Sequence, residues 1–161
     1  MTRPRIALVW RFAEHTSATR YAAVVSARAL LESVWLAGAD PVTLIAAPAP
    51  DGMDWPARLA GFDGVLLCGG ADVDPHLYGE TEIHPEVYDV DALQDEADLS
   101  LAAYCFEYGV PTLAVCRGLH VVNVLRGGTL VQHMDDHHRH VVHDVVIERG
   151  PAGIEPGPIT A

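Results

Sequence analysis

Short apolar runs alternate with amphipathic stretches along most of the chain, and this alternation constrains the fold more than any other feature. Strand-like runs lie at residues 5–10, 41–46, 62–67 and 111–115, and helix-like stretches lie at 19–36, at 93–108 and after Cys116. Strands that alternate with helices imply a mainly parallel sheet with helices on both faces. We therefore predict an open α/β sheet.

Glycine and proline residues refine the boundaries of these predicted elements. In the first helix-like stretch, six apolar residues recur at roughly helical spacing, and Gly38 follows as a left-handed helix end: Tyr21, Val24, Val25, Leu31, Val34 and Trp35. Residues 48–56 form a proline-rich connection, and 141–147 alternate weakly enough to suggest one more strand. Residues 150–161, rich in proline and glycine, are expected to form a loop or a flexible tail.

Composition narrows the function classes. The 161 residues are expected to form a single domain, 1–161, and no apolar run approaches the roughly 18 residues that a membrane helix needs. A net charge of −12 disfavours nucleic-acid backbones as partners. Three cysteines without a Cys-x-x-Cys pair, and an N-terminus without a signal-peptide pattern, favour a cytoplasmic protein with no disulfide framework and no membrane association.

Cys116 is the strongest candidate for a reactive side chain. It ends the apolar run that begins at Thr112, is followed by Arg117-Gly118, and precedes a helix-like stretch. A cysteine at a strand–turn–helix junction is lifted out of the sheet, with the next backbone N–H groups aimed at whatever the sulfur attacks. The alternative is an inert cysteine buried at a strand end, the environment we expect for Cys68 and Cys105.

A glycine pair occupies the equivalent position after another strand. Gly69-Gly70 follows the run 62–67, so it shares the carboxyl edge of the predicted sheet with Cys116. Glycine allows backbone to approach a ligand in a conformation that a Cβ would obstruct. An ordinary tight turn is the alternative reading of the pair.

Three sequence blocks give the chain a family resemblance. They are Gly64-Val-Leu-Leu-Cys-Gly-Gly-Ala-Asp-Val-Asp-Pro-His-Leu-Tyr-Gly-Glu80, the acidic helix around Asp95-Glu96, and Ala114-Val-Cys-Arg-Gly-Leu-His-Val-Val-Asn-Val-Leu-Arg-Gly-Gly-Thr-Leu130. In this order and spacing they resemble the class I glutamine amidotransferase superfamily, in particular its γ-glutamyl-γ-aminobutyrate hydrolase branch. The resemblance implies a flavodoxin-like sheet.

The same resemblance implies a reaction and a set of site residues. Cys116 would attack a γ-glutamyl amide, while Gly69, Gly70, Arg117 and Gly118 would bind the substrate or the oxyanion. The substrate would be a small γ-glutamyl molecule, and no cofactor is expected. The Arg117 side chain is expected to form a structural or surface ion pair, and Asp95 and Glu96 to complement the dipole of their helix.

One family feature is missing downstream of Cys116. The family's thiol is activated by a histidine that a glutamate orients, in a His-Pro-Glu-like segment near the end of the domain. His84-Pro85-Glu86 spells this tripeptide but precedes Cys116, and we interpret it as a coincidence. We therefore predict that the C-terminal part of the family domain is absent from this chain, and that a homodimer mate or a partner chain completes the fold.

The histidine-rich segment 133–143 leaves a second function open. It carries five histidines and two aspartates, which are good zinc or nickel ligands, but their spacing matches no specific site. Three readings follow: a γ-glutamyl hydrolase, a catalytically silent binding or scaffolding subunit, and a metal-binding protein. We favour the hydrolase, with no resident metal, because Cys116, the glycine pair and Arg117-Gly118 are all present.

Overall fold

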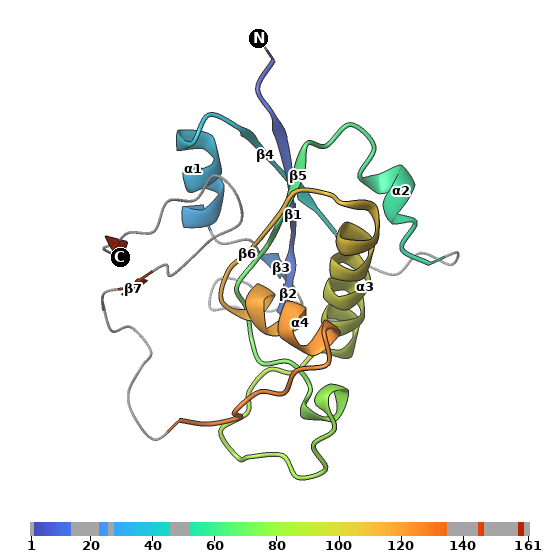
Figure 1. Ribbon diagram of the computed structural model, residues 1–161, viewed down its shortest axis with the longest axis vertical. Helices are drawn as coiled ribbons and strands as arrows, with labels where there is room; N and C mark the ends of the chain where they lie inside the picture. Colours follow the sequence, from blue (N-terminus) through green and yellow to red (C-terminus); the bar gives the residue numbers. More distant parts are fainter. Residues whose placement is uncertain are drawn as a thin grey trace.

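The computed structural model describes residues 2–13, 23–25, 28–45, 52–134, 145–146 and 158–159. Its centre is a sheet of four parallel strands in the order β4-β1-β5-β6 (Figure 1). These strands are β1 (Arg5–Val9), β4 (Asp40–Leu44), β5 (Gly64–Leu67) and β6 (Thr112–Ala114). The predicted parallel α/β sheet is thus confirmed, and each of the four predicted strands is present to within two residues.

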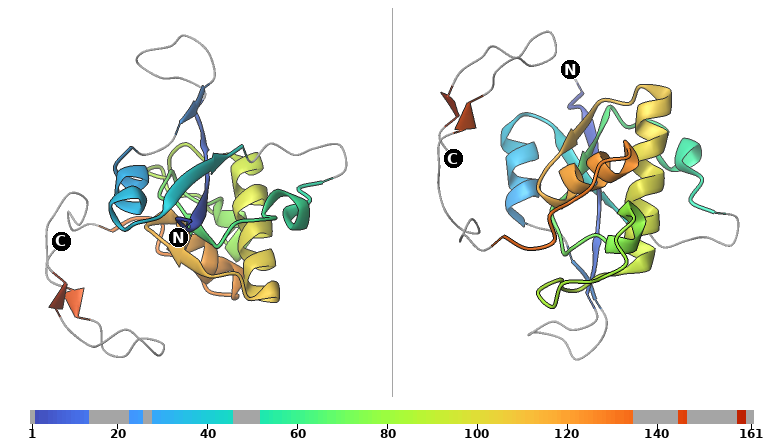
Figure 2. Two further views of the ribbon diagram at one scale, coloured as in Figure 1. Left: turned by 90° about the horizontal axis from the view of Figure 1, so that it is seen from above. Right: turned by 60° about the horizontal axis from the view of Figure 1, so that its bottom comes forward.

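Helices cover both faces of this sheet, as the alternation predicts. α1 (Arg28–Leu36) lies on one side, and α3 (Ala92–Tyr108) and α4 (Arg117–Leu125) lie on the other (Figures 1 and 2). Successive strand side chains point to opposite faces. Accordingly Val65 and Leu67 pack in the cluster that contains the α3 and α4 residues, whereas Leu66 packs with α1.

The predicted helix over residues 19–36 is wrong at residues 23–25, and residues 19–22 and 26–27 lie outside the described residues. Ala23–Val25 forms strand β3, which pairs antiparallel with strand β2 (Arg11–Ala13), and the helix begins only at Arg28. Val24 and Val25 are β-branched and suit a ladder better than a helix. The continuation of β1 into Arg11–Ala13 supplies a partner strand that helical periodicity cannot reveal.

Polar and glycine caps bound α3, and a glycine follows α1. Asp91 accepts a hydrogen bond from the Gln94 N–H at the start of α3, and Gly109 ends this helix at φ 65°. Gly38, at φ 92°, follows α1 as predicted. Two short elements inside the loops were not predicted, and both carry a proline in their first turn, where the missing N–H is harmless: α2 (Trp55–Arg58) and the 3₁₀ helix η1 (Pro75–Tyr78).

Two short strands lie near the C-terminus. β7 (Val145–Val146) pairs antiparallel with β8 (Pro158–Ile159). The weak alternation at 141–147 thus predicted a strand correctly at 145–146. The predicted tail 150–161 contains β8, and the rest of it lies outside the described residues.

An apolar groove of about 610 Å³ lies between α1 and the sheet, on the side of β6. Its walls include Leu30 and Val34 from the helix and Leu113 from β6, and Leu113 is 65% exposed. Exposed apolar surface at a sheet edge is the feature expected of a fold that another chain completes, and that partner stays a prediction. Within the described ranges, no helix has the length and apolarity required to cross a bilayer.

Candidate active site

Cys116 occupies a strained turn between β6 and α4. Its backbone has φ 54° and ψ −116°, a region that costs a residue with a Cβ on the order of 1–3 kcal/mol. The preceding residue still belongs to the sheet, because the Val115 N–H donates to the Leu67 carbonyl at 3.0 Å. The Cys116 side chain is exposed. The strand–turn–helix geometry inferred from the sequence is therefore present, with the thiol on the outside of the turn.

Gly118 lets α4 start directly above the sheet. A Cβ at this position would lie 2.4 Å from the Leu67 carbonyl oxygen and 2.8 Å from the Leu67 Cβ. Its N–H donates to the Val115 carbonyl at 3.0 Å, so this amide is already used within the turn. Gly118 thus serves the close packing of the nucleophile turn on β5.

Gly69 and Gly70 lie beside this turn, as their shared sheet edge predicts. A Cβ on Gly69 would lie 3.4 Å from the Cys116 Cβ and 3.8 Å from its Sγ. A Cβ on Gly70 would lie 2.9 Å from both Arg11 Nε and Arg117 Cδ. The structure therefore brings together the predicted site residues Cys116, Gly69 and Gly70, while their roles in substrate binding stay predictions.

Backbone amides of the glycine pair and of the residue after Cys116 are available as donors. The N–H groups of Gly69, Gly70 and Arg117 donate no hydrogen bond to another described residue. The Leu119 N–H, by contrast, donates to the Cys116 carbonyl at 2.8 Å. Unpaired amides at a strand end and a helix start can receive a developing negative charge.

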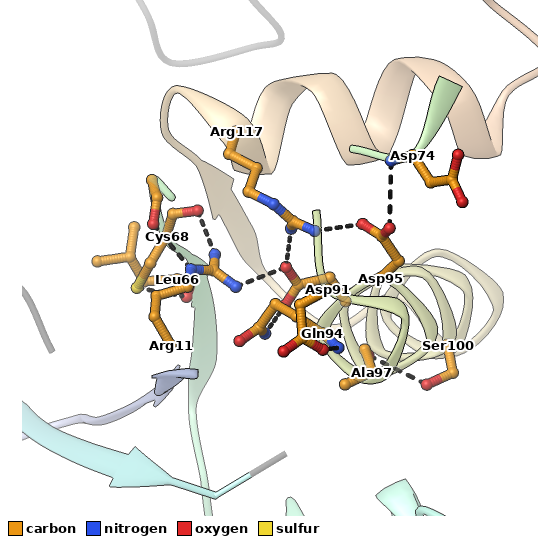
Figure 3. A network of polar contacts seen from close by, with 12 residues as sticks. Arg11, Leu66, Cys68, Asp74, Asp91, Gln94, Asp95, Ala97, Ser100 and Arg117 are labelled. Atoms are coloured by element: carbon orange, nitrogen blue, oxygen red, sulfur yellow. Dashed lines mark hydrogen bonds and ion pairs between the residues drawn. The ribbon is translucent and has the colours of Figure 1, made fainter. Parts of the chain in front are cut away.

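The Arg117 side chain turns inward and pairs with two aspartates of α3 (Figure 3). Only 2% of Arg117 is exposed, and its guanidinium binds the carboxylates of Asp95 and Asp98. The Arg117 ion pair was predicted without a partner. Asp95 lies in the first turn of α3, as predicted, and its buried side chain also pairs with Arg117, whereas Glu96 is exposed.

A second arginine completes the buried network. Arg11 Nη1 donates to Asp98 Oδ2 at 2.5 Å, and Arg117 binds the same carboxylate oxygen (Figure 3). The other Asp98 oxygen accepts from Gln94 Nε2 at 3.1 Å. Two arginines and two aspartates thus compensate one another in a site from which water is largely excluded.

Arg11 was missed by the sequence reasoning. Its Nε donates to the Gly69 carbonyl at 2.7 Å, and its Nη2 donates to the Cys68 carbonyl. The one hint in the sequence was an arginine directly after an apolar strand, at the carboxyl edge of the sheet where the predicted site lies. Nothing local links Arg11 to Asp98, which lies 87 residues away.

Asp95 connects this network to the loop that follows the glycine pair. Its Oδ2 accepts from the Asp74 N–H at 3.2 Å. Burial raises the pKa of Asp95, and the Arg117 guanidinium opposes this effect. The Asp74 carboxylate in turn accepts from the His76 N–H at 3.0 Å, a bond that lowers the pKa of Asp74. The Asp-Val-Asp-Pro sequence is therefore a structural element that orders the loop.

The His84-Pro85-Glu86 tripeptide lies in an exposed loop away from these contacts. The His84 N–H donates to Gln132 Oε1 at 2.7 Å, and its ring stacks on His133 at 4.7 Å. With Glu80 and Glu82, these residues line a cavity of about 650 Å³. No described residue makes a hydrogen bond to the Cys116 thiol, and His137 to His143 lie outside the described residues. In the part of the chain that the structure describes, no group of three metal-ligating side chains occurs.

The three thiols differ in a way that predicts their reactivity. Cys68 and Cys105 are buried, and burial raises the pKa of each, whereas Cys116 is exposed. Because the thiolate is the reactive species, we expect iodoacetamide to add one carbamidomethyl group to the native chain, at Cys116. Intact and peptide mass spectrometry would check this.

The matched control is Cys116→Ser, which should take up no label while folded and two labels in denaturant. Labelling of native Cys68 or Cys105 at a rate comparable to that of Cys116 would contradict the expected difference.

The sequence of this chain is similar to that of a known protein family and of several known proteins. A family model described as Peptidase C26 matches residues 6–157. A glutamine amidotransferase-like protein of Lactococcus lactis subsp. cremoris, the YvdE homologue, is 44% identical over 70 residues, which is 44% of this chain and 37% of the relative. The YvdE protein of Lactococcus lactis subsp. lactis is 38% identical over 81 residues, which is 50% of this chain and 34% of the relative.

An enzyme is among the relatives. The γ-glutamyl-γ-aminobutyrate hydrolase PuuD of Escherichia coli K12 is 37% identical over 73 residues, or 45% of this chain and 28% of the relative. Across these three relatives the matched segments span 28% to 37% of the relative's length.

Proposed function

Because the chain belongs to the peptidase C26 family, we propose that it hydrolyses γ-glutamyl amides with Cys116 as the nucleophile. The single observation that carries this proposal is the Cys116 turn. An exposed thiol is held at φ 54° beside Gly69, at the start of α4. A strained backbone at a sheet edge is typical of a residue whose side chain must be presented to a substrate.

The proposed reaction proceeds through a thioester. The Cys116 thiolate attacks the γ-carbonyl carbon, a C–S bond forms, and the carbonyl oxygen takes the negative charge. The Gly69, Gly70 and Arg117 N–H groups are the proposed donors to this oxygen. The C–N bond then breaks, the amine leaves with a proton, and water hydrolyses the thioester to release glutamate and the free thiol.

The leaving amine needs a proton donor, and the resemblance implies a histidine, oriented by a glutamate, that activates the thiol and could then return the proton. We propose that these residues lie outside the described residues or come from a partner chain, since the imidazole of His84 stacks on His133 and accepts a hydrogen bond from the Glu86 N–H. The choice of substrate separates the need for a proton donor from the ability of Cys116 to attack. An activated ester releases a stable anion that needs little protonation, whereas an amide releases an amine that must be protonated.

The test is release of glutamate from a panel of γ-glutamyl amides and from a γ-glutamyl 4-nitrophenyl ester. We expect the wild-type chain to form a γ-glutamyl thioester on Cys116 with the ester, seen as a mass increase and a burst of nitrophenolate. Amide turnover is expected once the acid–base residues are present in the same assembly. Cys116→Ala should abolish both signals.

Two outcomes would contradict the proposal. Glutamate release that persists in Cys116→Ala would assign the activity to another group. Absence of thioester in the wild type, with Cys116 still open to iodoacetamide, would show that the exposed thiol lacks an acyl-transfer site.

We also propose a cytoplasmic location. The reaction requires Cys116 as a free thiol, and all three cysteines of the structure are unpaired. The reducing cytoplasm maintains exposed thiols in this state.

A further inference from the structure

We propose that Arg11 is a positioning residue that builds the oxyanion site, by turning the Gly69 and Gly70 N–H groups toward the Cys116 side of the loop. This inference rests on the proposed function and adds a residue from a different part of the chain. It starts from the three bonds of one guanidinium. Arg11 binds the Gly69 carbonyl through Nε, the Cys68 carbonyl through Nη2 and Asp98 through Nη1.

The two carbonyl bonds determine the direction of the two following amides. In a trans peptide the C=O and the next N–H point in opposite directions. The Cys68 and Gly69 carbonyls both point at Arg11, so the Gly69 and Gly70 N–H groups both point away from it. Successive carbonyls in an extended strand alternate in direction, so this arrangement is a departure from the geometry of β5. Two adjacent N–H groups on one side form a concave anion-binding site.

The glycine contacts place this loop between Arg11 and the nucleophile. Gly70 packs against Arg11 Nε, since a Cβ there would lie only 2.9 Å away. A Cβ on Gly69 would instead meet Cys116, at 3.4 Å from the Cys116 Cβ. The side of the loop remote from Arg11 is therefore available to a substrate bound at the thiol.

Asp98 determines where Arg11 sits. The Arg11 side chain is only 12% exposed and that of Asp98 2%, so the ion pair is shielded from water and keeps a fixed geometry. Asp98 also binds Arg117, the residue next to the nucleophile. The buried carboxylate of Asp98 thus fixes Arg11, which binds the glycine loop, relative to Arg117, the first residue of α4.

The experiment compares Arg11→Met with a matched control, Arg3→Met. Arg3 has the same inventory of bonds, to the Asp40 carboxylate and to the Trp35 and Ala39 carbonyls, but it lies next to the amino end of β1. Two reactions of Cys116 are measured in each variant. Acylation by the γ-glutamyl 4-nitrophenyl ester passes through an oxyanion, whereas alkylation by iodoacetamide does not.

We expect Arg11→Met to slow acylation by about 10²–10³-fold, the usual cost of losing an oxyanion donor, while alkylation stays within about threefold of wild type. Millimolar guanidinium, far below denaturing concentrations, should partly restore acylation in Arg11→Ala. Arg3→Met should leave both rates within about threefold. A merely structural role for Arg11 would move acylation and alkylation together and would give no rescue.

The conformation of the loop is measured separately and needs no catalysis. The carbonyl ¹³C chemical shifts of Cys68 and Gly69 report the hydrogen bonds that these carbonyls accept. We expect these chemical shifts to change in Arg11→Met and to stay at their wild-type values in Arg3→Met. Unchanged shifts, or acylation in Arg11→Met within about threefold of wild type, would overturn the inference while leaving the proposed function intact. Failure of wild-type acylation would instead refute the proposed function, and the shifts would still decide whether Arg11 orients the loop.

Discussion

Asp98→Asn is expected to lower the free energy of unfolding by about 3–5 kcal/mol, the cost of breaking a buried ion pair by removing one charge. Asp98 is 1% exposed and accepts hydrogen bonds from Arg11, Arg117 and Gln94. With asparagine in its place, one negative charge faces two buried guanidinium groups, so one arginine is left without compensation. Urea denaturation followed by circular dichroism would measure the change. A loss of this size is a large fraction of the stability of an ordinary domain.

The matched control is Glu96→Gln on the same helix. Glu96 is exposed, so neutralising it should change the free energy of unfolding by no more than about 0.5 kcal/mol. The double variant Arg11→Met/Asp98→Asn should lose clearly less than the sum of the two single losses, because both remove the same pair. A loss below about 1 kcal/mol in Asp98→Asn, or full additivity in the double variant, would show that the network does not support the fold.

Gly118→Ala is the second substitution with a large expected effect. We expect it to lower the free energy of unfolding, whereas a glycine-to-alanine change in a helix usually raises it. Alanine in a helix is ordinarily better than glycine by up to about 1 kcal/mol. At Gly118 the added methyl group would lie 2.4 Å from the Leu67 carbonyl oxygen and 2.8 Å from the Leu67 carbonyl carbon, which are backbone atoms of the central sheet. Neither can move like a flexible side chain, so α4 must shift away from β5. We expect a loss of about 1–3 kcal/mol or more, measured by thermal and urea denaturation.

Gly69→Ala is the matched control for this substitution. Its methyl group would lie 3.4 Å from the Cys116 Cβ, an ordinary contact, so the fold should keep nearly its wild-type stability. The same methyl group would occupy space beside the thiol, and acylation of Cys116 should slow while unfolding does not change. A stable Gly118→Ala variant, or a Gly69→Ala variant destabilised as much as Gly118→Ala, would contradict this account of the turn.

Much of the fold could be predicted because it is encoded locally. The four central strands are apolar runs bounded by turn residues, and the long helix α3 ends at a glycine with φ 65°. Residues 23–25, predicted as helix and observed as strand, show the limit of this information. Apolar spacing at Val24 and Val25 fits a helix, yet the pairing of these residues with Arg11–Ala13 requires a partner strand whose position the local pattern does not specify.

For the candidate site too, local features could be predicted from the sequence and long-range contacts could not. By itself the sequence determined the Cys116 turn, the shared sheet edge of Cys116 and Gly69, and the need for glycine near the nucleophile, because turn chemistry and the order of strands and helices are local properties. Only the tertiary structure decided that Arg11 and Arg117 share Asp98, and that Asp95 is a buried partner of Arg117. Ion-pair partners are selected by which elements the fold brings together, and a charged residue carries no local mark of a partner 87 or 19 positions away.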